Sequence, residues 1–286
     1  MVATRNRLAQ LRQTLPRHHG PVILVDNGST DGTAAAVRRE FPHVSVVELG
    51  RNRGAPARNV GVRLARTDLV AFADDDSWWQ PGALAHAAAV FARHPDLGLI
   101  AAQVLVGQQQ QPDPTSRAMA HSPLPGRTDL PGPSVLGFLA CGAVLRRSAF
   151  LQAGGFDPVV FFFGEEERLA LDLAAAGWQS CYLAEVIAHH QPELVSHRSD
   201  RTALADRNRL LTALMRRPWP EVARIGWQCL KHGEAGRAGV RAALPRLLPA
   251  LRRRHRLPAR VEADRRSLDR VTLPEPGPIG AGALAG

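Results

Sequence analysis

Short apolar runs alternate with amphipathic stretches over the first 200 residues of the chain. The β-branched run at 22–25 predicts a buried strand, and comparable runs predict strands at 44–49, 69–73, 97–106 and 179–190. Apolar residues spaced three or four apart predict helices between them, at 31–40, 54–66, 81–94 and 165–176. Because strands that alternate with helices form parallel sheets, this pattern predicts an α/β fold with a mainly parallel sheet flanked by helices.

Two segments depart from this alternation. Residues 107–134 are rich in Pro, Gln, Ser and Gly, which predicts a mobile functional loop or a disordered segment. Beyond residue 200 the pattern becomes helical, with an amphipathic helix at 202–217 and Arg-rich helical sequence to about 271. We therefore predict an α/β domain at 1–200, a basic helical extension at 201–271 and a disordered tail at 272–286.

The positive charge of the chain is concentrated in that extension. The net charge is +10, and residues 201–272 hold 18 Lys and Arg against 6 Asp and Glu. The rest of the chain is thus nearly neutral, and the basic character belongs to the C-terminal extension rather than to the α/β domain.

No apolar run is long enough to span a membrane, and the first residues lack the apolar centre of a signal peptide. Three widely spaced cysteines predict reduced thiols and a cytoplasmic protein, because they fit neither a zinc motif nor a disulfide framework.

The stretch "FADDDSWWQP" at 72–81 places three adjacent carboxylates directly after a predicted strand. Asp26 likewise ends the strand at 22–25, and the carboxyl ends of parallel strands meet at one edge of a sheet. Helix capping requires a single Asp, so it leaves two carboxylates unexplained. Because like charges disfavour one another, a bound Mg²⁺ or Mn²⁺ ion is the alternative that we prefer for Asp74–Asp76.

Several motifs together resemble glycosyltransferase family 2, which has the GT-A fold. They are "ATRNR" at 3–7, "VDNGSTDGT" at 25–33, "RNRGAPARNVG" at 51–61, "FADDDSWWQPGAL" at 72–84, "GGFDPVVFFFGEEERLALDLAAAGW" at 154–178 and "AHH" at 188–190. The resemblance covers about residues 1–200. It implies an inverting, metal-dependent enzyme of the hexosyltransferase type that uses a UDP- or dTDP-type sugar donor.

The resemblance also implies roles for individual residues. The donor nucleotide would be bound by Thr4, Arg5, Asp26, Arg58, Asp74 and Asp75. The first and last acids of the DxD motif, Asp74 and Asp76, would hold Mn²⁺ or Mg²⁺ with its diphosphate, and His190 or His189 would complete the metal site. Such a cation stabilises the departing diphosphate as a Lewis acid. Trp78 and Trp79 are candidates for stacking on a sugar, although at least one is expected to be in the core.

The general base is expected at the start of the helix predicted at 165–176. The family pattern has an Asp where this chain has Glu166, which is chemically able to accept the acceptor's proton. Glu165 is the alternative base. The Glu in this position leaves a catalytically weak relative, acting as a binding protein, as an open alternative. A second departure is the short apolar run before "TRNR", from which we expect either a start upstream of Met1 or a shortened first strand.

Other functions and partners remain open from the sequence. A nucleotidyltransferase on a related fold would also use carboxylates and a metal, but it needs a basic phosphate-binding loop near the N-terminus. The basic extension would suit nucleic acid, yet no nucleic-acid motif is present, so none is expected as a partner. "MRRPWPEVARIGWQCLKHG" mixes Trp with Arg and Lys as interfacial helices do, which favours attachment of 201–271 to an anionic membrane surface on the inner face or to a partner. A solvated helical extension is the alternative that the sequence leaves equally open. The acceptor could be a glycan, a lipid-linked sugar or a small molecule.

Overall fold

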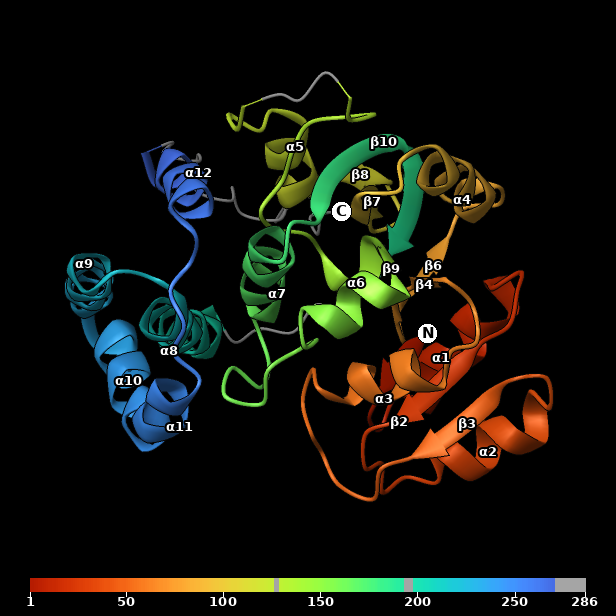
Figure 1. Ribbon diagram of the computed structural model, residues 1–286. Helices are drawn as coiled ribbons and strands as arrows, with labels where there is room; N and C mark the ends of the chain where they lie inside the picture. Colours follow the sequence, from red (N-terminus) through yellow and green to blue (C-terminus); the bar gives the residue numbers. More distant parts are fainter. Residues whose placement is uncertain (126–128, 193–197, 271–286) are drawn as a thin grey trace, which may run out of the picture.

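A computed structural model describes residues 1–125, 129–192 and 198–270. Four parallel strands form sheet A in the order β3-β2-β1-β5 (Figure 1). Their bounds are β1 Val2–Thr4, β2 Ile23–Asp26, β3 Ser45–Glu48 and β5 Ala73–Asp74. The predicted α/β fold and parallel sheet are confirmed here.

A second, mixed sheet lies beside sheet A, and the sequence alone did not separate the two. Sheet B has the order β4-β9-β7-β10-β6, with β8 paired to β7. Only β7 and β10 run parallel, and the other pairs are antiparallel. The bounds are β4 Leu69–Ala71, β6 Ser77–Trp79, β7 Leu97–Val106, β8 Gln111–Pro112, β9 Ala143–Arg146 and β10 Gln179–His190. The run predicted as one strand at 69–73 therefore crosses from sheet B to sheet A.

Helices cover both sheets and supply the apolar core. They are α1 Leu8–Thr14, α2 Thr33–Glu40, α3 Ala57–Leu64, α4 Ala83–Arg93, α6 Arg147–Gln152 and α7 Glu165–Ala175. Phe72, Phe150 and Phe156 pack ring against ring at centroid distances of 5.7 to 5.8 Å. Gly61 lets α3 approach β1, because a Cβ there would lie 2.5 Å from the Met1 side chain. This close packing fixes α3 against the strands that end at the acidic residues.

The expectation of a mobile or disordered segment at 107–134 is wrong for its first part. This part forms β8 and the helix α5 Pro114–Ala120. Asp113 caps α5 by accepting a hydrogen bond from the Thr115 amide, and buried Ser116 accepts one from the Val104 amide at 3.0 Å. Met119 joins the main core. Long-range packing orders a segment whose composition is typical of a loop.

The C-terminal helices form the predicted extension, on the left in Figure 1. They are α8 Arg198–Arg216, α9 Trp219–Lys231, α10 Gly233–Ala243, the short 3₁₀ helix η3 Leu244–Arg246, α11 Leu247–Arg252 and α12 Ala259–Arg270. The side chains of Arg198 and Arg201, and the tail at 272–286, lie outside the described residues. The boundary predicted at residue 200 stays a prediction.

Buried ion pairs fasten the extension to the α/β domain and connect helices within the extension. The buried Arg216 guanidinium donates to Asp172 of α7, with Nε 2.5 Å from Oδ1. Arg217, also buried, pairs with Glu262 and Asp269 of α12. Since an unpaired buried charge is costly, these pairs hold the helices in one arrangement.

Two further sequence expectations concern thiols and membrane spans. Cys141, Cys181 and Cys229 are free and buried, as predicted, and burial raises the pKa of each thiol. None of the helices in the described ranges has the length and apolar character needed to cross a bilayer.

Candidate active site

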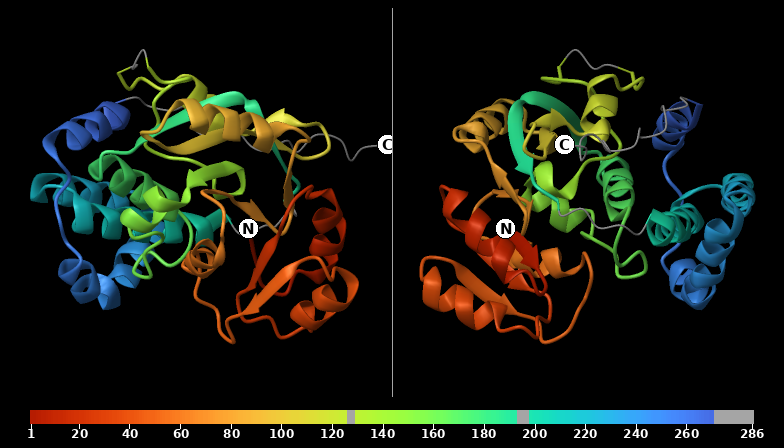
Figure 2. Two further views of the ribbon diagram at one scale, coloured as in Figure 1. Left: turned by 45° about the vertical axis from the view of Figure 1, so that its right-hand side comes forward. Right: turned by 180° about the vertical axis from the view of Figure 1, so that it is seen from behind.

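The carboxyl ends of three neighbouring strands bring the predicted acidic residues to one edge of sheet A. Thr4 of β1 is in register with Asp26 of β2, and Ala3 is in register with Asp74 of β5. Asp26 and Asp74 thus lie on the two strands that flank β1. Figure 2 shows the N-terminal part of the chain, coloured red and orange, from two further sides. The parallel sheet produces this juxtaposition because all three strands end at the same edge.

Asp26 shapes the turn that follows β2. Its buried carboxylate accepts a hydrogen bond from the Ser29 amide at 2.7 Å. The next residue, Asn27, donates to Asn52 at 3.1 Å and accepts from the Arg53 amide at 2.7 Å. Asn27 thereby ties the turn to the segment that leads into α3. The sequence analysis assigned no role to this Asn, although it stands within the "VDNGSTDGT" motif.

The three adjacent carboxylates have different partners. Arg58 of α3 forms an ion pair with Asp74. Asp75 accepts the Thr4 hydroxyl at 2.9 Å and the Arg7 guanidinium at 3.3 Å. Of the residues predicted for the nucleotide, Thr4, Arg58, Asp74 and Asp75 therefore form one connected cluster. Arg7 was not predicted, although it stands within the "TRNR" motif.

Asp76 connects the cluster to β10. It lies 3.3 Å from Arg7 Nη2 and 3.3 Å from His190 Nε2. The charge and hydrogen bond of Asp76 raise the pKa of His190, although burial alone would lower it. His189 instead stacks on Trp78, with ring centroids 5.2 Å apart. Because successive strand residues point to opposite faces, the pair separates and His190 is the histidine at the carboxylates.

Asp75 is the carboxylate of the cluster whose ionised form is disfavoured by its surroundings. Burial, together with the charges of Asp76 and Asp74, raises the pKa of Asp75 to about 6. The hydrogen bond from Thr4 and the charge of Arg7 act in the opposite direction but do not cancel this effect. Each additional cation near Asp75 would favour its ionised form.

Two other predicted residues, Arg5 and Trp79, have partners outside the carboxylates. Arg5 is exposed, and its Nε is 3.4 Å from the Gly28 carbonyl oxygen. Trp79 is buried, and its indole N–H donates to the Phe72 carbonyl at 3.1 Å. Trp79 is therefore the tryptophan that belongs to the core, as expected for at least one of the two.

Glu165 and Glu166 begin α7 beside this cluster. Glu165 is buried and its Oε1 lies 3.9 Å from Arg58 Nη1, so Arg58 stands between Glu165 and Asp74. Glu165 Oε2 and Arg58 Nε are buried without a hydrogen-bond partner among the described residues. Burial and the neighbouring Glu165 charge raise the pKa of Glu166 to about 8. A carboxyl group with this pKa can exchange a proton near neutral pH.

The loop before α7 carries functional candidates that sequence reasoning missed. Phe161 and Phe163 adopt positive φ angles of 69° and 73°, a conformation that costs energy for a phenylalanine. Asn208 of α8 donates to the carbonyls of Phe162 and Phe163, both at 2.6 Å. Phe162 is 52% exposed and Phe163 37%. The "FFFG" run was a visible signal, but nothing in the sequence linked it to Asn208.

The donor set of the cluster fits a hard divalent cation. Carboxylate oxygens with a neutral imidazole suit Mn²⁺, and Mg²⁺ commonly takes one or two carboxylates and completes its shell with substrate phosphates. His190 Nε2 lies 3.3 Å from Asp76 Oδ1. Burial and the two neighbouring carboxylates raise the pKa of Asp75, and a bound cation would oppose this effect. Within the described part of the chain, no three potential ligands converge into a closed cage.

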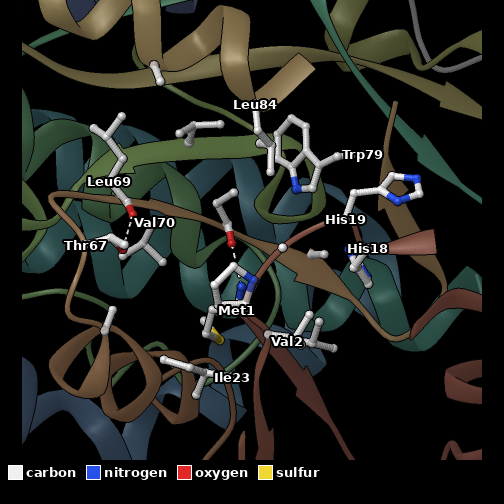
Figure 3. A pocket seen from close by; sticks show the side chains of 18 of the residues that line it. Met1, Val2, His18, His19, Ile23, Thr67, Leu69, Val70, Trp79 and Leu84 are labelled. Atoms are coloured by element: carbon white, nitrogen blue, oxygen red, sulfur yellow. Dashed lines mark hydrogen bonds between the residues drawn. The ribbon is translucent and has the colours of Figure 1, made fainter. Parts of the chain in front are cut away.

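A large cavity lies at the other end of the strands, away from the carboxylates. It has a volume of about 1240 Å³ and lies between the amino ends of β1, β2 and β4 and the helix α4. Figure 3 shows mostly apolar side chains around it, among them Val2, Ile23, Leu69 and Leu84. The Met1 ammonium donates to the Ala71 carbonyl at 2.7 Å, and burial lowers its pKa to about 5. His18, His19 and Asp68 also line the cavity, but they lie at the opposite end of the strands from the acidic cluster.

A sequence model of the family described as glycosyl transferase family 2 matches residues 2–153, more than half of the chain. This chain belongs to glycosyltransferase family 2. The glycosyltransferase is 29% identical over 241 residues to the N-acetylglucosaminyl-diphospho-decaprenol L-rhamnosyltransferase of Mycobacterium tuberculosis, which covers 65% of this chain and 75% of that relative. It is 30% identical over 208 residues to the pre-mycofactocin glycosyltransferase of the same organism, over 68% of this chain and 43% of the relative.

Solved structures share the fold of this glycosyltransferase. The mannosyltransferase PcManGT from Pyrobaculum calidifontis, in complex with GDP-Man and Mn²⁺, has a TM-score of 0.54 at 22% identity and covers 88% of this chain and 72% of its own. S. aureus TarS with UDP-GlcNAc has a TM-score of 0.59 at 17% identity, over 92% and 82%. The predicted GT-A fold and glycosyltransferase class are thus confirmed, and the nucleotidyltransferase alternative has no support.

Proposed function

We propose that this glycosyltransferase moves a sugar from a UDP- or dTDP-type donor to an acceptor hydroxyl, with inversion, and that Glu166 is the general base. The observation that carries this proposal is the chain of contacts from Asp74 through Arg58 to Glu165, beside Glu166. It links the predicted donor site to a carboxyl group whose pKa is raised to about 8. Glu165 is the weaker candidate for the base, because Arg58 already faces it.

The residues of the cluster divide the work between donor and acceptor. Thr4, Arg5, Asp26 and Arg58 would bind the nucleotide and orient its diphosphate. Asp76, Asp74 and His190 would hold Mn²⁺ or Mg²⁺, with His189 as a weaker candidate. When bound, the cation supplies Lewis-acid stabilisation to the departing diphosphate. Glu166 accepts the proton of the attacking hydroxyl, so that the oxygen gains nucleophilicity as it approaches the anomeric carbon.

For the acceptor we propose a lipid-linked sugar. The support is the identity of one relative, the N-acetylglucosaminyl-diphospho-decaprenol L-rhamnosyltransferase. Such an acceptor would bring the enzyme to a membrane surface, in agreement with the inner-face location predicted for residues 201–271.

Calorimetry with UDP, dTDP and GDP, each with and without Mn²⁺, tests the donor and metal parts of the proposal. We expect one nucleotide to bind in a metal-dependent manner and Asp76→Asn to weaken this binding at least tenfold, because the cation loses a charged ligand. Asp68→Asn is the matched control, since this aspartate is exposed and remote from the cluster. Absence of binding for all three nucleotides would leave the alternative of a catalytically weak relative.

A further inference from the structure

Helix α9 exposes apolar side chains on the face that does not pack on the molecule. Trp219 is 57% exposed, Trp227 62% and Leu230 41%. At about 100° per residue these three positions fall within an arc of roughly 80°. The opposite face buries Ile225 and Cys229 against Ala213 of α8. The exposed arc is therefore separate from the contacts that fold the extension.

Cations accompany the two exposed tryptophans. Lys231 Nζ lies 5.5 Å from the ring centre of Trp227, and the Arg254 guanidinium lies 4.1 Å from that of Trp219. Residues 219–256 contain nine Arg and Lys against two Asp and Glu. Three arginines of this segment are exposed and belong to α10 and α11: Arg237, Arg241 and Arg252. The apolar arc thus lies within a strongly basic helical unit.

The combination of exposed apolar side chains and surrounding cations on α9 distinguishes between the partners that could bind this face. A second copy of the chain would bring two basic surfaces together, and like charges oppose such pairing. Nucleic acid would use the cations but would leave the leucine and the two indoles without an apolar environment. A bilayer interface with anionic lipids satisfies both, because indole rings favour the headgroup region and Lys and Arg attract lipid phosphates.

We propose that α9 binds the surface of an anionic lipid bilayer. Trp219, Trp227 and Leu230 enter the headgroup region, and Lys231 contacts lipid phosphate. The proposal does not rest on the donor or the acceptor of the reaction. The η3–α11 segment exposes Leu244, Leu248 and Leu251 at positions four and three residues apart, and these leucines form a second candidate contact on the same extension.

Vesicle sedimentation of the full-length protein, without donor or acceptor, tests the proposal. We compare phosphatidylcholine vesicles with vesicles that also contain phosphatidylglycerol. We expect binding to the anionic vesicles, with a blue shift of tryptophan emission, and at least tenfold weaker binding for the double variant Trp219→Ala/Trp227→Ala. Lys231→Gln should weaken binding about fivefold, the effect of one cation at a charged bilayer.

The matched control is Leu151→Ser, which alters an exposed leucine of α6 outside the extension and should bind like the wild type. Circular dichroism establishes that each variant is folded. The proposal is overturned if neutral and anionic vesicles bind equally, if neither binds, or if the double tryptophan variant keeps wild-type affinity. A concentration-dependent dimer that the double variant abolishes would assign the face to a second copy instead. Nucleotide calorimetry is independent of every one of these outcomes.

Discussion

The surroundings of Glu166, the general base proposed above, determine how this carboxyl group can act. Burial and the adjacent Glu165 oppose its ionisation, so its pKa rises from 4.5 to about 8. At neutral pH the free enzyme therefore holds most of this carboxyl group in the protonated form. Glu166 has to lose that proton before it can accept one from the acceptor.

The rate of transfer should consequently rise with pH. We expect kcat/KM to increase through a midpoint near pH 8, because the ionised Glu166 is the active form. Glu166→Gln should lower the rate by about 10²–10⁴-fold, the usual contribution of a general base. Glu167→Gln serves as the control, since Glu167 pairs with Arg265 of α12 and is not assigned to the reaction. A profile that is flat in the wild type would argue against Glu166 as the base.

The same raised pKa affects stability with a definite sign. The folded state binds more protons at Glu166 than the unfolded state between pH 4.5 and about 8. The contribution of this group to the free energy of unfolding is therefore fully present below pH 4.5 and falls as the pH rises through that window. Glu166→Gln removes this contribution, which denaturant titrations at several pH values can follow.

Among the elements, β1 has the most unusual environment. Met1, which directly precedes this strand, carries a buried ammonium group, and a cavity of about 1240 Å³ with mostly apolar walls lies beside it (Figure 3). Within the described residues, the edge of β4 that faces away from β9 is not paired with another strand of sheet B. The cavity thus has apolar walls and a neighbouring strand edge, which are the features that a strand engineered onto the chain before Met1 would need for packing and pairing.

Adding a few alternating apolar residues before Met1 should raise the melting temperature, because they can fill the cavity and move the charge away. The Met1 amine has a folded pKa of about 5 against 8.0, so the unfolded state binds more protons between these values. The contribution of this amine to stability should therefore increase as the pH rises from 5 to 8, opposite in sign to the contribution of Glu166. A Gly/Ser extension is the control: it should remove this pH dependence without filling the cavity. Equal melting temperatures for the two extensions would contradict the prediction.

For the whole molecule, the helical extension supports the start of α7. Asn208 of α8 holds the carbonyls of Phe162 and Phe163, and Arg207 donates to the Val160 carbonyl at 3.1 Å. These bonds stabilise a loop whose positive φ angles are unfavourable in isolation. The loop leads directly into Glu165, so we infer that the extension positions Glu165 and Glu166, the two candidates for the base.

Asn208→Ala tests this coupling between the extension and the site. We expect kcat to fall about tenfold or more, because two hydrogen bonds of about 1 kcal/mol each no longer hold the loop. Affinity for the nucleotide should stay unchanged, and hydrogen exchange should increase at residues 159–164. Arg209→Gln is the control on the same helix, because the Arg209 guanidinium donates to Gln228 of α9 at 2.8 Å. A parallel loss of nucleotide affinity would indicate general unfolding rather than a positioning role.

Much of the candidate site followed from local sequence. Asp26 and Asp74 could be placed together because both end strands of one parallel sheet, and Trp79 was recognised as a possible core residue. The ordered helix α5 and the strand crossing between Ala71 and Ala73 could not be predicted. In both cases distant partners, Val104 for Ser116 and β9 for β4, determine the local conformation.

The sequence by itself determined which chemical groups are present and in what order, because apolar periodicity specifies the strands and each acidic motif follows a strand end. Only the tertiary structure decided how these groups are paired. It assigned Arg58 to Asp74, Arg7 and Thr4 to Asp75, and His190 rather than His189 to Asp76. The reason is that these contacts join residues far apart in the chain, whose distances depend on how the two sheets and the helices pack.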